Sequence, residues 1–361
     1  IAVRVRALVA RQYACLNQVL LPALAERGVR VVEWDDLDEG QRTALKGRFA
    51  ADIFPLLTPL SMASGPTRSF PMLVSLGLAL AVSLRRGGSG RSELGYVHVP
   101  DDLRRYVPVP ESKDLILVER VIAAHMSMLF PGTEIDAVYS FRASRQGDVE
   151  IDEDSSGSLL ARVADEVEER RYKPIVRLEV AAAMPREIRA TIVKAIRDEQ
   201  TLDAATLTRS DVYEAPGPVD LRGLAELADA DVPGETFPPF TPGDPIPRDR
   251  SIFDVLGERD VLCHHPFHDF SLTVGRFLNE AANDPDVVSI KLTLYRTGRH
   301  SPIMDALLLA MSEGKEVSVF VELTARFDEA SNIEWTRRLE AAGARVVYGV
   351  MGYKTHAKTA L

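Results

Sequence analysis

Cysteine is scarce in this chain of 361 residues. The two that occur, Cys15 and Cys263, lie far apart along the sequence and belong to no CxxC or CxH spacing. Zinc sites and disulfide frameworks need several suitably spaced residues of this kind, so neither is expected. Scarce cysteine is also typical of a reducing compartment, and we therefore expect a cytoplasmic protein.

Long hydrophobic runs and an excess of positive charge are also missing. The longest apolar stretch, residues 72–84, is interrupted by Ser75 and Gly77 and is too short to cross a bilayer, and we recognise no signal peptide. A formal net charge of −10 argues against a generally basic surface that binds nucleic acid. Residues 291–361 differ, because they carry ten Lys and Arg against eight Asp and Glu, which allows a local cationic pocket for an anionic substrate.

The patterning predicts a multidomain protein of mixed α+β and α/β class. Apolar residues at helical spacing cover residues 1–27 and 38–53, as in a partial helical N-terminal domain at 1–55. An α+β head domain is expected at 56–250. Within it we expect a hairpin of residues 72–84 and 94–99 with a glycine-rich tip at 86–91, helices 156–172 and 185–199 on one face of a mixed sheet, and a proline-rich connection at 231–247.

Residues 251–361 alternate helix and strand and predict an incomplete α/β domain. The expected order is helix 271–283, strand 287–295, helix 302–314, strand 317–323, helix 330–342, strand 344–350 and a terminal strand that contains His356. Both ends of the chain fall inside predicted elements, so we expect it to be part of a longer protein.

Charged residues follow three successive strands of this domain. Arg296 ends the first, Arg326 follows the second, and Lys354, His356 and Lys358 follow the third. Ligands of parallel α/β sheets collect at the carboxyl ends of the strands, which favours an anion site here. Two alternatives stay open: Arg326 in an exposed ion pair with a neighbouring acidic residue, and Arg296 in a solvated loop.

The HxK pattern of His356 and Lys358 suits phosphoryl transfer through a phosphohistidine. In a strand, residues i and i+2 lie on the same face, so the imidazole and the ammonium would point the same way, and Lys354 joins them if the strand begins early enough. Nearby positive charges favour a neutral ring with a nucleophilic nitrogen and then receive the anionic phosphoryl group. The pattern alone also fits a surface histidine.

Two further clusters are expected to be structural. His264, His265 and His268 resemble a metal cluster, but no carboxylate or cysteine is spaced to complete a zinc site. The acidic residues at 150 and 152–154 precede a predicted helix start and are typical of a solvated turn.

Several segments of the chain carry a family signature. In the last domain these are Ile290-Lys-Leu-Thr-Leu-Tyr-Arg-Thr297, Ser301-Pro-Ile303, Val321-Glu-Leu-Thr-Ala-Arg-Phe-Asp-Glu329 and Val347-Tyr-Gly-Val-Met-Gly-Tyr-Lys-Thr-His-Ala-Lys358. Upstream they are Phe54-Pro-Leu-Leu-Thr-Pro59, Phe70-Pro71, Val176-Arg-Leu-Glu179 and Phe237-Pro-Pro-Phe-Thr-Pro242. Together they resemble the long-form bacterial polyphosphate kinases over essentially the whole chain. Thr324 departs from the family, which commonly has lysine there, and we expect a slightly weaker phosphate affinity.

The resemblance implies a helical N-terminal domain, a head domain and a first catalytic domain with a phospholipase D-like fold. It implies that ATP phosphorylates His356, and that Arg296 and Arg326 lie at a magnesium and phosphate site. A guanidinium has no lone pair to give to Mg²⁺, so we expect both arginines to hold phosphate oxygens that the metal also touches. Lys358 and, more weakly, Lys354 would share the binding of phosphate.

The implied reaction is reversible. His356 attacks the γ-phosphate of ATP in line, ADP leaves, and the phosphoryl group passes to inorganic polyphosphate. The implied state is a homodimer or higher homo-oligomer, which in some family members associates with the inner face of the membrane. Family members also carry a second HxK histidine and a nucleotide-binding asparagine in regions outside this sequence, so this chain alone is expected to be inactive.

Two other functions stay open. One is a phospholipase D-like phosphodiesterase or nuclease that uses the same histidine with water as the acceptor. The other is a non-catalytic remnant that binds polyphosphate.

Overall fold

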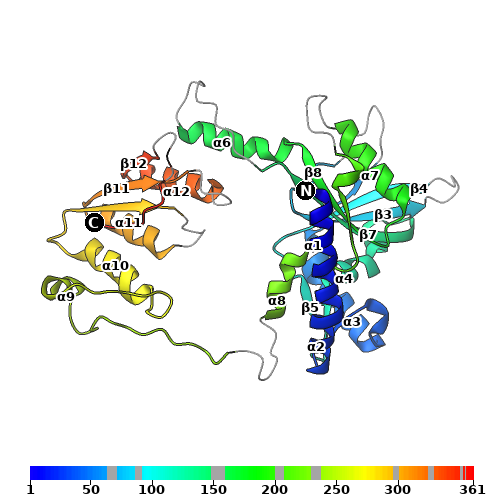
Figure 1. The fold of residues 1–361 in the computed structure, drawn as a ribbon, viewed down its shortest axis with the longest axis horizontal. Helices are drawn as coiled ribbons and strands as arrows, with labels where there is room; N and C mark the ends of the chain where they lie inside the picture. Colours follow the sequence, from blue (N-terminus) through cyan, green and yellow to red (C-terminus); the bar gives the residue numbers. More distant parts are fainter. Residues whose placement is uncertain are drawn as a thin grey trace. The chain divides into compact units, whose positions relative to one another are not determined.

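The computed structural model describes residues 1–62, 71–85, 92–147, 159–199, 207–228, 237–295, 301–323, 329–349, 353 and 355–361 (Figure 1). Its contacts divide the chain into two compact units: unit 1 is Ile1–Gly147 with Arg171–Thr236, and unit 2 is Asp148–Arg170 with Phe237–Leu361. The mixed α+β class is as predicted, whereas the domain boundaries expected at residues 55 and 250 stay predictions. Among the residues described, none of the helices combines the length and the apolar character needed to cross a membrane.

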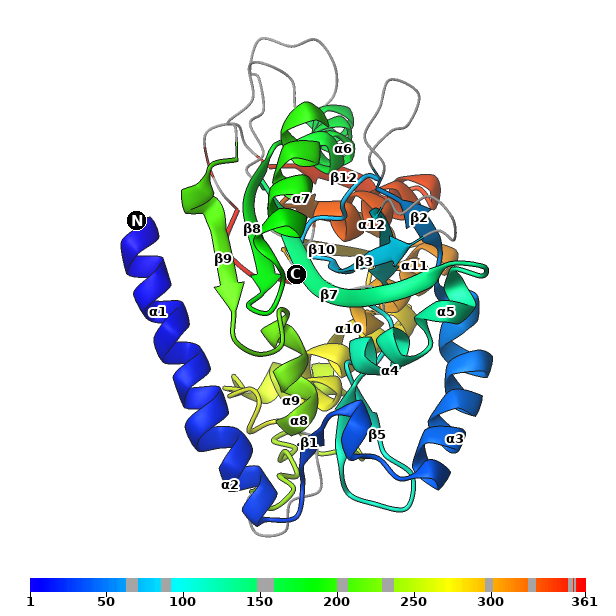
Figure 2. The same ribbon diagram turned by 90° about the vertical axis from the view of Figure 1, so that its right-hand side faces the viewer.

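Unit 1 begins with a rod of helix built from α1 (Ala2–Cys15), the π-helical segment η1 (Leu16–Leu20) and α2 (Leu21–Glu26), which run on from one another in Figure 2. Gly28 ends the rod with φ 84°, a conformation that glycine adopts without a Cβ clash. Helix α3 (Glu39–Arg48) is capped by Asp38, whose Oδ1 accepts a hydrogen bond from Gln41 N at 2.8 Å in a capping box. It continues through η3 (Phe49–Ile53), so both helices predicted before residue 55 are confirmed.

The main sheet of unit 1 has six strands in the order β2-β4-β3-β7-β8-β9, antiparallel except for β8 and β9. The strands are β2 (Pro59–Ser61), β3 (Leu78–Arg85), β4 (Ser92–Val99), β7 (Glu134–Arg145), β8 (Ile175–Ala181) and β9 (Val212–Ala215). Strands β3 and β4 form the predicted hairpin, whose expected tip lies outside the described residues. Strand β3 starts at residue 78 instead of 72 because the chain turns just before it, where Leu76 has φ 62°.

Smaller elements complete unit 1. A second sheet has the order β1-β6-β5. Its strands are β1 (Val31–Val32), β5 (Tyr106–Pro108) and β6 (Leu115–Leu117). The remaining helices are α4 (Val118–Ala124), α5 (Met126–Leu129), α7 (Arg186–Glu199) and α8 (Leu224–Ala228), with short turns η2 (Trp34–Asp36), η4 (Phe54–Leu56), η6 (Arg209–Asp211) and η7 (Leu221–Gly223).

Strand β3 is buried on both faces over residues 78–82, which explains the apolar sequence of that part. Leu80 and Val82 join a core that also contains residues of α1, α3 and α4. Ala79 and Ala81 face the opposite core, where α7 contributes fully buried Ile192 among others. The prediction that helix 185–199 packs on the mixed sheet is therefore confirmed.

Unit 2 is built on a parallel sheet in the order β10-β11-β12. Its strands are β10 (Ser289–Leu294), β11 (Glu316–Val321) and β12 (Arg345–Tyr348). Its helices are α6 (Leu159–Glu169), α9 (Ile252–Glu258), α10 (Arg276–Asn283), preceded by η8 (Ser271–Gly275), α11 (Pro302–Ser312) and α12 (Glu329–Ala341), while η5 (Arg170–Tyr172) follows α6. The predicted alternation of helix and strand from residue 271 to 350 is confirmed.

Two expectations about packing were wrong. Helix α6 does not pack on the mixed sheet of unit 1: its Val163 is fully buried in the core of unit 2, and α6 packs against α12. Its residues 159, 160, 163, 164 and 167 form one apolar face that joins this core. The terminal segment with His356 is not a regular strand: among residues 355–361 only Ala360 forms a β-bridge, to Leu292 of β10.

Candidate functional site

The chain that leaves β12 returns to the outer side of β10 and runs antiparallel to it. Lys291 and Leu361 exchange two backbone hydrogen bonds of 2.8 Å, and Thr293 N donates to Thr359 O at 3.0 Å. The Thr293 hydroxyl adds a bond to Ala357 O at 2.9 Å and accepts one from Thr359 N at 2.8 Å. This pairing brings His356 to the carboxyl end of the parallel sheet, the end at which ligands bind in such sheets.

His356 and Lys358 meet the same aromatic ring. The centroids of the His356 and Tyr295 rings lie 5.3 Å apart with an interplanar angle of 83°. The Lys358 ammonium lies 4.3 Å from the centroid of the Tyr295 ring, a cation–π contact, and donates to His356 O at 2.5 Å. Both side chains therefore contact the Tyr295 ring.

Two buried residues connect this segment to the sheet. Glu322, which follows β11, accepts a hydrogen bond from Thr355 N on its Oε2 at 2.8 Å. Asn332 of α12 donates from Nδ2 to the backbone oxygens of Tyr295 and Glu322, each at 2.9 Å. The ends of β10 and β11 and the residue before His356 are thereby joined.

Three predicted site residues, Arg296, Arg326 and Lys354, lie outside the described residues, so their predicted roles stay predictions. Arg296 directly follows Tyr295 in the sequence. Glu329, an acidic neighbour of Arg326 in the sequence, is buried and is held by Arg170 through bonds of 2.6 and 3.2 Å.

In the part of the chain that the structure describes, no set of side chains could bind a resident Mg²⁺ ion. No three His, Cys, Asp or Glu side chains are placed there so that they could hold a metal ion together, and arginine and lysine offer no lone pair to a metal. Mg²⁺ commonly binds through substrate phosphates and keeps several waters.

The cluster of His264, His265 and His268 is tied together by local contacts. His268 Nδ1 accepts a hydrogen bond from His264 N at 3.0 Å, and His265 Nε2 lies 2.9 Å from Thr273 Oγ1. The His264 ring packs on Phe267, with centroids 4.9 Å apart. These contacts describe a folded turn around the three histidines.

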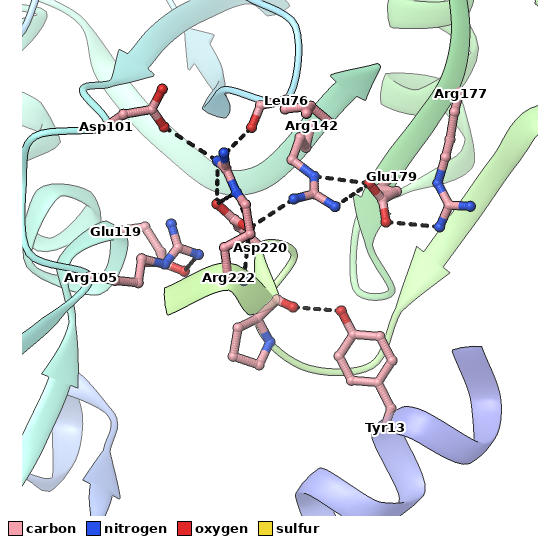
Figure 3. A network of polar contacts seen from close by, with 11 residues as sticks. Tyr13, Leu76, Asp101, Arg105, Glu119, Arg142, Arg177, Glu179, Asp220 and Arg222 are labelled. Atoms are coloured by element: carbon pink, nitrogen blue, oxygen red, sulfur yellow. Dashed lines mark hydrogen bonds and ion pairs between the residues drawn. The ribbon is translucent and has the colours of Figure 1, made fainter. Parts of the chain in front are cut away.

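A second polar network lies in unit 1, at the end of β8 and β9 (Figure 3). Arg142 of β7 contacts Glu179 Oε2 at 2.7 and 2.9 Å and Asp220 Oδ1 at 2.8 Å. Arg222 holds Asp220 at 2.7 Å from the other side. Burial raises the pKa of Asp220, but hydrogen bonds from Arg222 and the charge of Arg142 outweigh it, and the pKa is lowered from 3.8.

Two neighbours of this network have raised pKa values. Burial raises the pKa of Tyr13 to about 12, helped by the charge of Glu179, and the Tyr13 hydroxyl donates to Pro218 O at 2.6 Å. Burial also raises the pKa of Glu119, although the Arg105 guanidinium lies 2.5 Å away. The network is a structural ion-pair cluster because its charges face one another.

Sequence patterning did not identify Tyr295, Glu322 or Asn332 as site residues. Glu322 carried a usable signal, since it is the only charged residue in the predicted strand 317–323, and a charge in a buried strand needs a partner. Asn332 lies within a helical pattern and offered no such signal.

Comparisons with known proteins agree with this fold. A family model described as polyphosphate kinase middle domain matches residues 40–227, and one described as polyphosphate kinase C-terminal domain 1 matches residues 251–361. Polyphosphate kinase from Streptomyces coelicolor is 41% identical over 99% of this chain and 47% of its own length, and that from Mycolicibacterium gilvum is 41% identical over 94% and 47%. The crystal structure of polyphosphate kinase from Porphyromonas gingivalis has a TM-score of 0.71 at 30% identity, covering all of this chain and 52% of that one.

The fold and the site define a mixed α+β protein that presents a histidine and a lysine at the carboxyl end of a parallel sheet. The chain belongs to the polyphosphate kinase family. It spans about half the length of the curated relatives it matches.

Proposed function

We propose that the protein to which this chain belongs transfers the terminal phosphate of ATP reversibly to inorganic polyphosphate, with His356 as the nucleophile. The observation that carries this proposal is the exposed His356 beside Lys358 on the Tyr295 ring. A nucleophile for a phosphoryl group must be accessible, and a cation next to it stabilises the anionic group during transfer. The domain order of helical piece, head domain and phospholipase D-like domain belongs to the same proposal.

The chemistry follows from these residues. A ring nitrogen of His356 attacks the γ-phosphorus of ATP, the bond to the β,γ-bridging oxygen breaks, and ADP leaves with that oxygen. The terminal oxygen of a polyphosphate chain then attacks the phosphohistidine, which frees the imidazole and lengthens the chain by one phosphate. Lys358, with Arg296, Arg326 and Lys354 as family resemblance suggests, would neutralise charge on the transferring group.

Location and assembly are part of the proposal. ATP as the substrate and two free cysteines support a cytoplasmic site of action. Family resemblance supports a homodimer or higher homo-oligomer, with ATP, ADP and polyphosphate as the small-molecule partners.

The test uses the protein extended to the full length of its relatives. Incubation with γ-labelled ATP and Mg²⁺ should give an acid-labile, alkali-stable protein phosphate on His356 that chases into added polyphosphate. His356→Ala should abolish this label, whereas His264→Ala, which removes another exposed histidine of unit 2, should retain it. Hydrolysis of a phosphodiester without label would support the phosphodiesterase instead, and polyphosphate binding without either reaction would support a non-catalytic protein.

Lys358→Met provides a second arm of this test. We expect the rate of labelling to fall by about tenfold or more, because the cation beside the nucleophile is lost. An unchanged rate would remove Lys358 from the proposed machinery while leaving His356 in it.

A further inference from the structure

Glu322 is a buried carboxylate directly after a strand whose inward-facing residues are apolar. Only 4% of the residue is exposed, and it directly follows β11, whose buried residues Val317, Val319 and Val321 form part of the core of unit 2. Burying a carboxylate is costly unless hydrogen bonds compensate. The Thr355 N–H supplies one such bond at 2.8 Å, and Thr355 directly precedes His356.

Asn332 fixes the backbone from which Glu322 acts. It is 2% exposed, and its amide nitrogen donates to the carbonyls of Glu322 and Tyr295, each at 2.9 Å. One side chain of α12 therefore spans the ends of β10 and β11. Tyr295 in turn provides the ring that His356 and Lys358 contact.

The His356 segment needs such a restraint. Residues 356–359 are exposed; the Thr293 hydroxyl donates to Ala357 O, and the backbone bonds to β10 begin at Thr359. On the other side of His356, the Glu322 carboxylate holds Thr355. His356 is thus held from both sides, by Thr293 of β10 after it and by Glu322 before it.

We propose that Glu322 is a positioning residue for the His356 nucleophile. Asn332 supports this role because it holds the backbones of Glu322 and Tyr295 in place. The inference rests on the proposed phosphoryl transfer and adds the residues that aim the imidazole. In-line attack needs the reacting atoms about 3–3.5 Å apart, and a misplacement of about 1 Å costs roughly 100-fold in rate. We expect the restraint to depend on the acceptor oxygen that reaches Thr355 N and not on the charge of the carboxylate.

Two substitutions distinguish the effect of the length of the Glu322 side chain from the effect of its charge. Glu322→Gln keeps the length and an acceptor oxygen but removes the charge. Glu322→Asp keeps the charge but withdraws the acceptor by one methylene. The assay is single-turnover labelling of the full-length protein with γ-labelled ATP. We expect Glu322→Asp to slow phosphohistidine formation by roughly 10- to 100-fold and Glu322→Gln to slow it by less than about threefold. The affinity for ATP should change by less than about twofold in both variants.

A readout independent of activity accompanies the kinetics. Hydrogen exchange of the Thr355 amide should be faster in Glu322→Asp and close to wild type in Glu322→Gln, because the amide loses its acceptor only in the first. Asn332→Asp, which replaces the donor by an acceptor of equal size, should also slow labelling. Glu316→Gln, at the exposed opposite end of β11, is the matched control and should change neither measurement.

The outcomes distinguish the two levels of the proposal. Wild-type protein without label on His356 would refute the proposed function, while the exchange data would still report whether Glu322 restrains the segment. A labelled wild type with equally fast Glu322→Asp would overturn the positioning role alone. Fast Glu322→Asp with slow Glu322→Gln would also overturn it, because the carboxylate would then act through its charge.

Discussion

The Lys358 ammonium lies over the Tyr295 ring, 4.3 Å from its centroid. The same ring receives the edge-on contact with His356, so one aromatic side chain at the end of β10 organises both members of the HxK pair. Tyr295 is followed by Arg296 in the sequence. The end of β10 therefore places an aromatic ring beside the proposed nucleophile, directly before the arginine that is expected to bind phosphate.

Tyr295→Leu should slow phosphohistidine formation by about three- to tenfold, whereas Tyr295→Phe should stay within about twofold of wild type. A cation–π contact at an exposed site contributes roughly 0.5–1 kcal/mol, and leucine removes the ring while phenylalanine keeps it. Initial rates of labelling from γ-labelled ATP in the full-length protein provide the measurement. Equal rates for the two variants would show that the ring does not organise the pair.

The sequence predicted the elements of unit 2 better than their contacts. The helices and strands from residue 271 to 350 follow from local periodicity and from glycine at helix ends, such as Gly314 with φ 80°. Local patterns say that a helix has an apolar face but not which core it joins, and for this reason α6 was assigned to the wrong sheet. Local patterns could not identify Asn332 either, because the two carbonyl oxygens that it contacts belong to residues 37 and 10 positions away in the sequence.

The ionised Asp220 should stabilise unit 1, and Asp220→Asn should lower the free energy of unfolding at neutral pH by about 2 kcal/mol. The substitution removes one of the two carboxylates that Arg142 contacts and the nearer of the two that Arg222 contacts, and the Asp220 side chain is only 9% exposed. Urea denaturation measures the effect. Asp101→Asn is the control, because the exposed contact of Asp101 with Arg222 is 3.3 Å long and such pairs contribute about 0–1 kcal/mol.

The pH dependence of this difference tests its cause. The pKa of Asp220 is lowered in the folded state from 3.8, so its stabilising contribution is complete well above that value and is lost as the pH falls through the folded pKa. The gap between wild type and Asp220→Asn should therefore be widest near about pH 7 and narrow toward about pH 3. A gap that stayed constant with pH would indicate that packing, and not ionisation, is responsible.

The buried pair of Arg170 and Glu329 should hold α6 against α12 within unit 2. Glu329 has 4% of its side chain exposed, so Arg170→Ala leaves a buried carboxylate without this partner, at a cost of about 3 kcal/mol in unfolding free energy. Hydrogen exchange should also speed up in α6. The bidentate but exposed pair of Arg250 and Glu258 is the control: Arg250→Ala should cost less than about 1 kcal/mol.

Gly223 should not tolerate a side chain, although it is not in a left-handed conformation. A Cβ built there would lie 2.4 Å from Arg105 Cγ and 2.7 Å from Arg105 Cβ, and Arg105 is buried against Glu119. Gly223→Ala should therefore displace that pair and cost roughly 1–3 kcal/mol in unfolding free energy. Gly47→Ala is the control: nothing lies within 4 Å of its Cβ, and inside helix α3 alanine should stabilise by roughly 0.5–1 kcal/mol. Destabilisation by both substitutions would rule out the steric explanation for Gly223.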